Sequence, residues 1–223
     1  MPSVPPLRRA RHVSAGLALA AFAFLCACVA LSGGLFFDRP VYEAIASLRS
    51  PGLTWFLVRF TNMGDVPVLL PLTLVLLGAC CLKKRPGLGV LLAGNLALAA
   101  LCNHLVKQVF QRARPDELLR LIEESGFSFP SGHSFTSMAF YGFLIYLIWK
   151  SFPDAAWKIP ACAGLGLLIL CIGLSRIYLG VHYASDVLAG FCGGVIWISV
   201  LTCIPAVRRI AIKSHPSEGG TNP

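Results

Sequence analysis

Residues 13–37 read VSAGLALAAFAFLCACVALSGGLFF, and none of these twenty-five side chains is charged. A helix of about 20 apolar residues is long enough to cross the hydrocarbon core of a bilayer. Arg8, Arg9 and Arg11 stand just before this stretch, as basic residues do before a secretory signal sequence. The apolar core of a signal sequence has only about 7–15 residues. The sequence therefore predicts a retained membrane-spanning helix.

Five further apolar stretches follow the first along the chain. The sequence predicts spans over residues 66–82, 87–110, 131–149, 159–175 and 186–207. Asp65 is a suitable N-cap for the second span, and Pro67 suits its first turn. Six spans in all predict an all-α, polytopic membrane protein.

Composition supports this fold class. The chain is 56% hydrophobic and 13% charged, with a mean hydropathy of +0.72. Soluble domains contain about 25% charged residues, and a soluble fold this apolar has too few polar side chains to cover its surface. Ordinary soluble globular, disordered and fibrous proteins are therefore excluded.

A long segment separates the first span from the second. Over residues 37–64, apolar side chains recur at helical spacing and are interrupted by Pro51 and Gly52. This pattern predicts one or two amphipathic helices in the membrane interface. The predicted division of the chain is a basic cytoplasmic N-terminus (1–12), a six-helix membrane domain (13–210) and a polar, disordered cytoplasmic tail (211–223).

The distribution of charge predicts the orientation. With the N-terminus inside and six crossings, the inner segments hold 11 Lys and Arg residues against two acids, whereas the outer segments hold eight of each sign. The whole net charge of +9 then lies on one side, as the positive-inside rule requires. We therefore expect a protein of the inner membrane with both termini in the cytoplasm. We expect no nucleic-acid partner, because the basic residues are scattered over short loops.

Nine cysteines occur in the chain, an odd number, all within or beside apolar stretches. None forms a CxxC pair or stands at zinc-ligand spacing from a histidine. They are expected to be small hydrophobic side chains within the spans.

Ionisable residues gather at the predicted outer ends of the last four spans. Lys107 ends the third span and Arg114-Pro115 follows it; Pro130-Ser131-Gly132-His133 begins the fourth. A helix start offers free N–H groups to an anion, and glycine lets the anion come close. Ser175-Arg176 ends the fifth span, and His182 and Asp186, four residues apart, open the sixth.

Each of these residues has an ordinary structural interpretation when it is taken alone. Lys107 and Arg176 would anchor helix ends, Arg114 would be a solvated loop residue, and Ser131 would be only an N-cap. Together, three cations, two histidines and a carboxylate at one membrane level indicate a functional site, because ionisable groups near spans are costly and usually functional.

The pattern Lys107-x6-Arg114-Pro115, Pro130-Ser131-Gly132-His133 and Ser175-Arg176-x5-His182-x3-Asp186 resembles the three-part signature of the phosphatidic acid phosphatase type 2 / haloperoxidase superfamily. The six-span arrangement is similar to its integral-membrane lipid phosphatase branch. The resemblance implies catalytic roles for His182, as a nucleophile that becomes a phosphohistidine, for His133, as the general acid and base, and for Asp186, as the partner of His182.

The resemblance also implies the rest of the site. Lys107, Arg114, Ser131, Gly132 and Arg176 would bind the phosphate oxygens, with no metal or other cofactor. The implied substrate is a phosphorylated membrane lipid at the outer face. Undecaprenyl pyrophosphate, phosphatidylglycerol phosphate, phosphatidic acid and diacylglycerol pyrophosphate all remain open.

Alternatives remain at this stage. A lipid phosphotransferase would use the same phosphohistidine, and a transporter or membrane scaffold would release no phosphate. The soluble haloperoxidase branch disagrees with six spans. Asn103 and His104 are expected either to brace Lys107 or to serve helix packing, and Glu123 and Glu124 to be solvated loop acids. Gly190 and Gly194 predict close helix packing more than a homodimer interface.

Overall fold

The computed structural model describes residues 6–212, and every regular element within them is a helix. The α-helices are α1 (Pro6–Ser32), α2 (Asp38–Ala46), α3 (Pro51–Phe60), α4 (Val66–Leu82), α5 (Pro86–Phe110), α6 (Gly132–Ser151), α7 (Lys158–Tyr178), α8 (Ala184–Leu201) and α9 (Pro205–Ile212). Two short 3-10 helices, η1 (Thr61–Gly64) and η2 (Glu117–Leu119), lie between them. The predicted all-α class is confirmed.

Four helices are long and apolar enough to cross a membrane: residues His12–Ser32 of α1, and the whole of α5, α7 and α8. A fifth candidate is the continuous path through α3, η1 and α4, which bends by 52°. The molecule is therefore a helical membrane protein with four or five such segments among its described residues.

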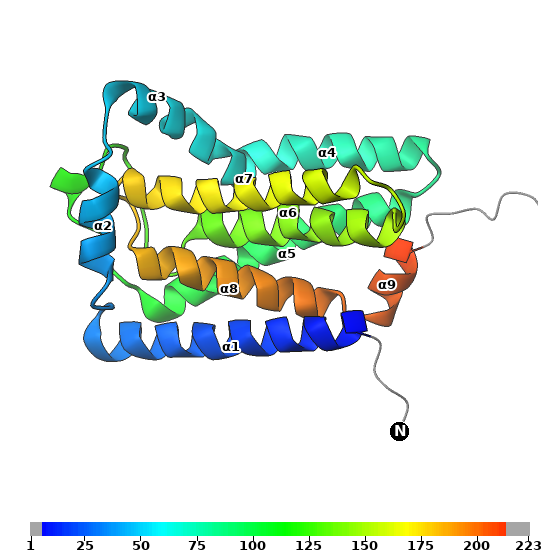
Figure 1. Ribbon diagram of the computed structural model, residues 1–223, viewed down its shortest axis with the longest axis horizontal. Coiled ribbons are helices and arrows are strands. Elements are labelled where there is room, and N and C mark those ends of the chain that lie inside the picture. The colour runs from blue at the N-terminus through cyan, green and yellow to red at the C-terminus, as the bar shows by residue number, and fades with distance from the viewer. Residues whose placement is uncertain (1–5, 213–223) are drawn as a thin grey trace, which may run out of the picture.

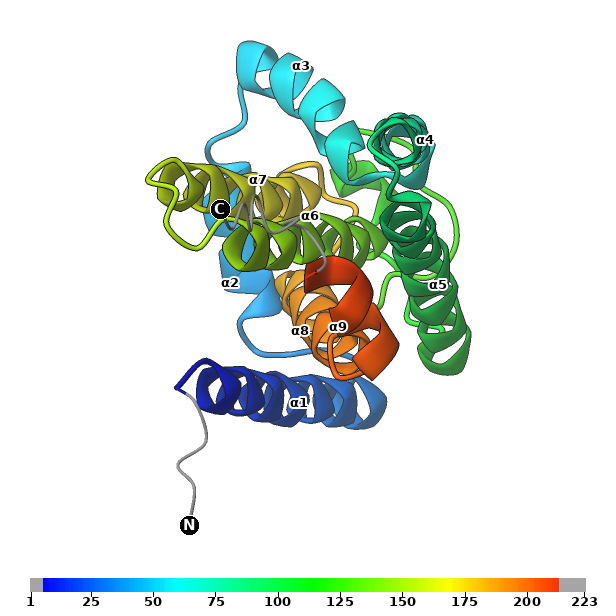
Figure 2. The same ribbon diagram turned by 90° about the vertical axis from the view of Figure 1, so that its right-hand side faces the viewer.

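Helix α6 forms the centre of the bundle. It packs against α5, α7 and α8, and α1 covers the outer side of α8 (Figure 1). The end-on view shows α5, α7 and α8 arranged around α6 (Figure 2). Phe140 and Phe143 of α6 are fully buried and belong to two neighbouring apolar clusters. The middle of α6 is thereby buried in the core of the bundle.

Most predicted helix boundaries agree with the structure. Helix α4 begins and ends at the predicted residues, and the Asp65 carboxylate accepts a hydrogen bond from Val66 N at 2.8 Å. The sixth span differs, because α8 ends at Leu201 and not at Val207. Pro205, which lacks an N–H, starts the separate helix α9.

The two ends of the chain also differ from the predicted division. Helix α1 already begins at Pro6 and ends at Ser32, before Gly33, whose φ of +73° suits glycine. Positions 211 and 212 belong to α9, and the rest of the tail predicted to be disordered lies outside the described residues.

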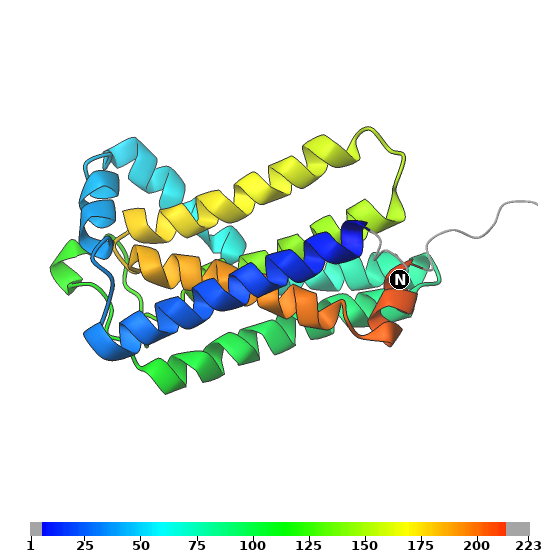
Figure 3. The same ribbon diagram turned by 60° about the horizontal axis from the view of Figure 1, so that its bottom comes forward.

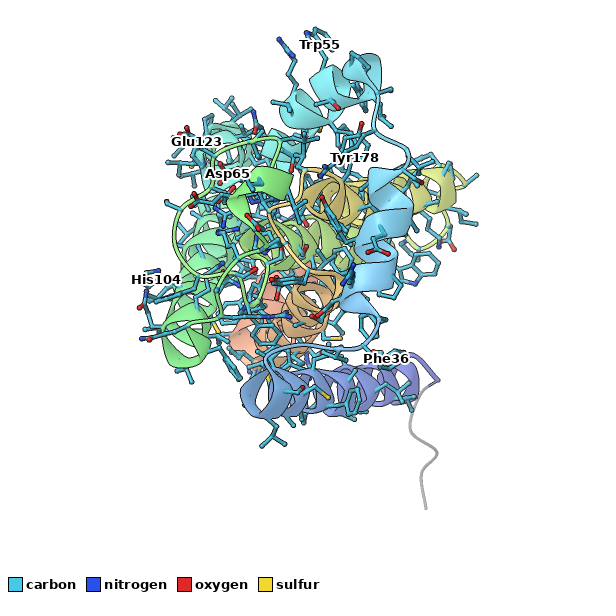
Figure 4. All side chains as sticks on the ribbon, turned by 90° about the vertical axis from the view of Figure 1, so that its left-hand side faces the viewer. Phe36, Trp55, Asp65, His104, Glu123 and Tyr178 are labelled. Carbon is cyan, nitrogen blue, oxygen red and sulfur yellow. The ribbon has the colours of Figure 1, made fainter. Side chains whose placement is uncertain are left out.

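The segment predicted to lie in the membrane interface contains α2 and α3. Helix α2 lies across one end of the bundle, and Val41, Tyr42 and Ile45 pack against residues of α7 and α8 (Figures 1 and 3). Helix α3 extends away from the centre, and Trp55 lies at its exposed edge (Figure 4). Of these two helices, α3 is the one that presents large apolar side chains outward.

Glycines of α8 let this helix come close to the start of α6. A Cβ atom on Gly190 would lie 2.7 Å from Ser134 Cβ and 2.8 Å from the carbonyl oxygen of Ser131. A Cβ atom on Gly194 would lie 2.5 Å from Met138 Cβ. These contacts within one chain support the close-packing interpretation of the two glycines.

Candidate active site

A cavity of about 320 Å³ lies at the end of the bundle that carries α2. Of the eight residues that the sequence predicts for the site, five line it: Lys107, Arg114, Gly132, His133 and His182. They come from the end of α5, the loop after it, the start of α6 and the loop before α8. Two motif residues separated by 68 positions, Arg114 and His182, are in direct contact there.

The imidazole of His182 lies between a carboxylate and a guanidinium. Its Nδ1 is 3.4 Å from Asp186 Oδ2, and its Nε2 is 3.1 Å from Arg114 Nη1. Because arginine can only donate, Nε2 must accept, and the proton of the neutral ring must be on Nδ1. The unprotonated nitrogen of His182 is therefore the one beside the cationic side of the site.

His182 and Asp186 come together through a helix cap. The sequence predicts that both residues open the sixth span, but α8 begins only at Ala184, with Tyr183 as its N-cap. Asp186 turns back and accepts from Tyr183 N at 2.9 Å, which brings its Oδ2 to the imidazole. Ser128 also donates to Asp186 Oδ2. The expected contact exists, and a capping box produces it.

Burial and nearby cations keep His182 neutral. Burial is the main cause that lowers the pKa of His182 well below its ordinary value, and Arg114, Lys107 and Arg176 lower it further. Burial also lowers the pKa of Arg114 to about 10, so its guanidinium remains charged at pH 7. The site thus combines a neutral imidazole with permanent positive charge.

Lys107 and Gly132 lie on the same side of the cavity. Lys107 Nζ donates to the carbonyl oxygen of Phe127 at 2.5 Å, and a Cβ atom on Gly132 would lie 3.9 Å from Lys107 Cε. Asn103 also lines the cavity; its side chain is buried, and its Nδ2 has no hydrogen-bond partner. His104 faces outward, with its Nε2 3.4 Å from Gln108 Nε2 (Figure 4).

The other three predicted residues lie behind the cavity wall. Asp186 is buried behind His182. Ser131 is fully buried and caps α6, accepting from Ser134 N at 3.4 Å and from Ser134 Oγ at 3.0 Å. For Ser131 the N-cap interpretation therefore describes the observed contacts. Arg176 is also buried and donates to Thr61 Oγ1 at 3.1 Å.

Glu124 closes the cationic side of the cavity. Its Oε2 pairs with Arg176 Nη2, and its Oε1 is 3.5 Å from Arg114 Nη2. The expectation that Glu124 is an ordinary solvated loop acid is wrong. Glu123, its neighbour, is exposed on the loop that covers this end of the bundle (Figure 4). Adjacent acids in one loop have the same sequence signal, so only the three-dimensional contacts distinguish them.

Sequence reasoning also missed Arg112, Ser128 and Asp38. All three are buried, and all take part in the hydrogen bonds that surround the Asp186 carboxylate. Arg112 is two positions before Arg114, and its presence between two motif residues was the one available signal. Within residues 6–212, no group of three or more His, Cys, Asp and Glu side chains is arranged to hold a metal ion.

Comparisons with known proteins agree on one family. The family model of the PAP2 superfamily matches residues 88–210. Phosphatidylglycerophosphatase B of Bacillus subtilis is 32% identical over 160 residues, which are 71% of this chain and 78% of that protein. Undecaprenyl-diphosphatase of Sulfolobus acidocaldarius is 30% identical over 167 residues, 72% of each chain.

A solved structure shows the same arrangement of helices. The crystal structure of a transmembrane PAP2-type phosphatidylglycerolphosphate phosphatase from Bacillus subtilis superposes with a TM-score of 0.77 at 29% sequence identity. The match covers 85% of this chain and 94% of that chain.

Proposed function

The chain belongs to the PAP2 superfamily, and from this premise we propose that it is a membrane enzyme that hydrolyses the phosphate monoester or pyrophosphate of a lipid. The observation that carries the proposal is the position of His182. Its Nε2 lies 3.1 Å from Arg114 Nη1, and the residue shares a cavity with Lys107 and His133.

In the first step, the lone pair of His182 Nε2 attacks phosphorus and forms a P–N bond. The bond between phosphorus and the leaving oxygen breaks, and His133, which must carry a second proton for this step, gives that proton to the leaving oxygen. Asp186 accepts the Nδ1–H hydrogen bond and stabilises the positive charge that develops on the ring. Lipid alcohol or lipid phosphate leaves, and a phosphohistidine remains.

In the second step, water replaces the imidazole. His133, now neutral, takes a proton from the water whose oxygen attacks phosphorus. The P–N bond breaks, inorganic phosphate is released, and His182 returns to its neutral form. Lys107 and Arg114 hold the non-bridging oxygens from the cavity in both steps, and Gly132 adds its backbone N–H. Arg176 reaches them from behind the cavity wall, in place of its contact with Glu124. These fixed cations supply the charge neutralisation that other phosphotransfer enzymes obtain from Mg²⁺.

The membrane arrangement forms part of the proposal. We propose six crossings, by α1, α4, α5, α6, α7 and α8, with both termini cytoplasmic and the site at the outer face of the cell membrane. The central position of α6 among α5, α7 and α8 supports its crossing with them (Figure 2). The exposed Trp55 and Phe56 support an interfacial position for α3.

A lipid phosphotransferase is the second candidate, because it would form the same phosphohistidine and pass the phosphoryl group to an alcohol instead of water. Turnover that depends on an acceptor alcohol distinguishes the two reactions. The named relatives act on different lipids, so a panel of substrates is required. Phosphatidylglycerol phosphate, undecaprenyl pyrophosphate and phosphatidic acid represent a monoester with a polar headgroup, a prenyl pyrophosphate and a simple monoester.

The deciding experiment measures phosphate release by the purified full chain over this panel in the presence of EDTA. We expect release from at least one lipid with EDTA present. We also expect a phosphoenzyme that is absent from His182→Ala, in samples quenched with detergent at alkaline pH, because a P–N bond hydrolyses in acid. Activity that is lost on chelation and restored by Mg²⁺ would exclude the mechanism. Release that persists in His182→Ala would exclude the assigned nucleophile.

A further inference from the structure

The Asp186 carboxylate is held by different groups at its two oxygens. Oδ2 faces His182 and accepts from Tyr183 N and Ser128. Oδ1 accepts from Arg112 Nη1 at 2.6 Å. The carboxylate cannot turn about its own axis without losing the Arg112 contact, so the direction of Oδ2 toward the imidazole depends on the group that holds Oδ1.

Arg112 is itself fixed from several sides. Its Nη2 donates to Asp38 Oδ2 at 2.9 Å, and its Nη1 donates to Ser185 Oγ at 2.8 Å. Its guanidinium carbon lies 4.1 Å from the centre of the Tyr183 ring. Side-chain exposure is only 7% for Arg112 and for Asp38. The guanidinium of Arg112 thus bridges the carboxylates of Asp38 in α2 and Asp186 in α8. Arginine can do this because its N–H groups form a planar fork, which the ammonium group of lysine lacks.

Asp38 connects this bridge to the end of the bundle. Its Oδ1 accepts from Ser185 N at 2.8 Å and its Oδ2 accepts from Leu35 N at 3.1 Å. Helix α2, predicted from the sequence only as an interfacial helix, therefore supplies a buried acid to the surroundings of Asp186.

Arg112 and Arg114 face different cavities although only one residue separates them. Arg114 lines the cavity that contains Lys107 and His133. Arg112 lines a second cavity, of about 1050 Å³, together with Asp38 and Tyr183. His182 borders both. The two arginines are therefore on opposite sides of the imidazole, and only Arg114 is beside the proposed phosphate position.

We propose that Arg112, supported by Asp38, is a positioning residue that holds the Asp186 carboxylate in line with His182 and does not bind the phosphate. This inference rests on the proposed function of His182 as the nucleophile. Partners of a group that orients a histidine typically affect activity 10- to 100-fold when they are removed, by analogy with the outer shell of metal sites.

The test compares two variants with a matched control in the full-length protein. Arg112→Lys keeps the charge and loses the fork. Asp38→Asn with Arg112→Gln removes one charge of each sign, so that the net charge around Asp186 is unchanged. Arg114→Lys is the control. We expect both Arg112 variants to lower kcat by about 10- to 100-fold with KM and inhibition by inorganic phosphate unchanged. Arg114→Lys should raise KM and weaken phosphate inhibition.

Two results would overturn the inference: Arg112 variants with the kcat of the parent, or Arg112 variants that raise KM as Arg114→Lys does. A parent that releases no phosphate from any lipid would instead contradict the proposed function.

A titration of His182 by ¹⁵N NMR tests the inference without turnover. Arg112→Gln alone removes a cation beside Asp186. The negative potential of Asp186 and Asp38 at the imidazole then increases, while the contributions of Arg114, Lys107, Arg176 and His133 stay the same. We expect the pKa of His182 to rise in Arg112→Gln and to change much less in Arg112→Lys. An unchanged pKa of His182 in Arg112→Gln would contradict the proposed coupling of Arg112 to His182 through Asp186. A variant that only lowers the stability of the protein would leave the pKa of His182 unchanged.

Discussion

His182 illustrates how a reactive group can be specified by its neighbours. Arg114 donates to Nε2 and Asp186 accepts from Nδ1, so the tautomer is fixed from both sides of the ring. Burial and the surrounding cations disfavour a second proton, which would remove the nucleophilic lone pair. Arg114, which binds the phosphate in the proposed mechanism, therefore also keeps the imidazole of His182 neutral.

This arrangement predicts the protonation of His182 over a wide pH range. Because its folded pKa is lowered, the ring should stay neutral, with the proton on Nδ1, when the pH falls through about 6.5, where a free histidine gains its proton. Histidine ¹⁵N chemical shifts measure this directly, and the signal missing from His182→Asn gives the assignment. A signal that changes to the doubly protonated form near pH 6.5 would contradict the prediction.

Glu124 places a carboxylate on two of the proposed phosphate-binding arginines. A substrate phosphate must compete with this anion for Arg114 and Arg176, so Glu124→Gln should tighten inhibition by inorganic phosphate and by vanadate. The side chain is 27% exposed, and a contribution of roughly 1 kcal/mol corresponds to about a fivefold lower inhibition constant.

Glu123→Gln is the matched control for Glu124→Gln, because Glu123 is exposed on the same loop. It should leave both inhibition constants unchanged. Weaker phosphate binding in Glu124→Gln would show that the carboxylate supports Arg176 more than it competes with the anion.

At the scale of elements, the contact between α6 and α8 sets the position of the start of α6, where Gly132 and His133 lie. Ser131 N donates to the carbonyl oxygen of Asp186 at 3.0 Å, so the residue before Gly132 and His133 is bonded to the helix that carries Asp186. Gly190, one turn further along α8, contacts the same first turn of α6. The distance between the two histidines therefore depends on how closely these helices approach.

Gly190→Ala should disrupt this approach. The new Cβ atom would meet the carbonyl oxygen of Ser131 and Ser134 Cβ at 2.7–2.8 Å, so we expect a loss of about 1–3 kcal/mol of stability and a fall in kcat as the start of α6 moves. Thermal unfolding in detergent and phosphate release measure the two effects. Gly166→Ala in α7 is the control, because a Cβ atom there meets no atom within 4 Å. Equal stability of the two variants would contradict the argument.

At the scale of the whole molecule, local patterns predicted the helices well. Asp65 and Pro67 mark the start of α4 in the sequence, and the helix begins between them. The end of α8 at Leu201 was missed, because residues 202–204 are as apolar as a span and only Pro205 interrupts the helix.

The residues of the site could be predicted where their spacing in the sequence follows the signature. They could not be predicted where their role depends on contacts with residues far away in the chain. Five of the predicted residues line one cavity, since the signature fixes them relative to helix ends. The roles of Arg112 and Glu124 depend on partners 52 to 74 residues away, which no local pattern encodes.

The orientation of the molecule in the membrane is its most general testable property. Helix α2 and the turn between α4 and α5 lie at opposite ends of the bundle (Figure 1). The cavity is lined by residues at the end that carries α2. The turn carries Lys83, Lys84 and Arg85, and a cluster of cations next to a span favours the cytoplasmic side. We therefore expect the end with His133 and His182 to be outside, where the proposed reaction would act on lipids of the outer leaflet.

Labelling of single cysteines tests this orientation in intact cells. All nine native cysteines must first be replaced, and phosphate release by the cysteine-free protein checks that it still folds. An impermeant thiol reagent should label a cysteine at position 123 from outside, and one at position 84 only after lysis, since both positions are exposed. The reverse pattern would place the His133 and His182 end in the cytoplasm, and the charge argument would fail. The internal geometry of the site would remain, because none of its hydrogen bonds depends on the side of the membrane that it faces.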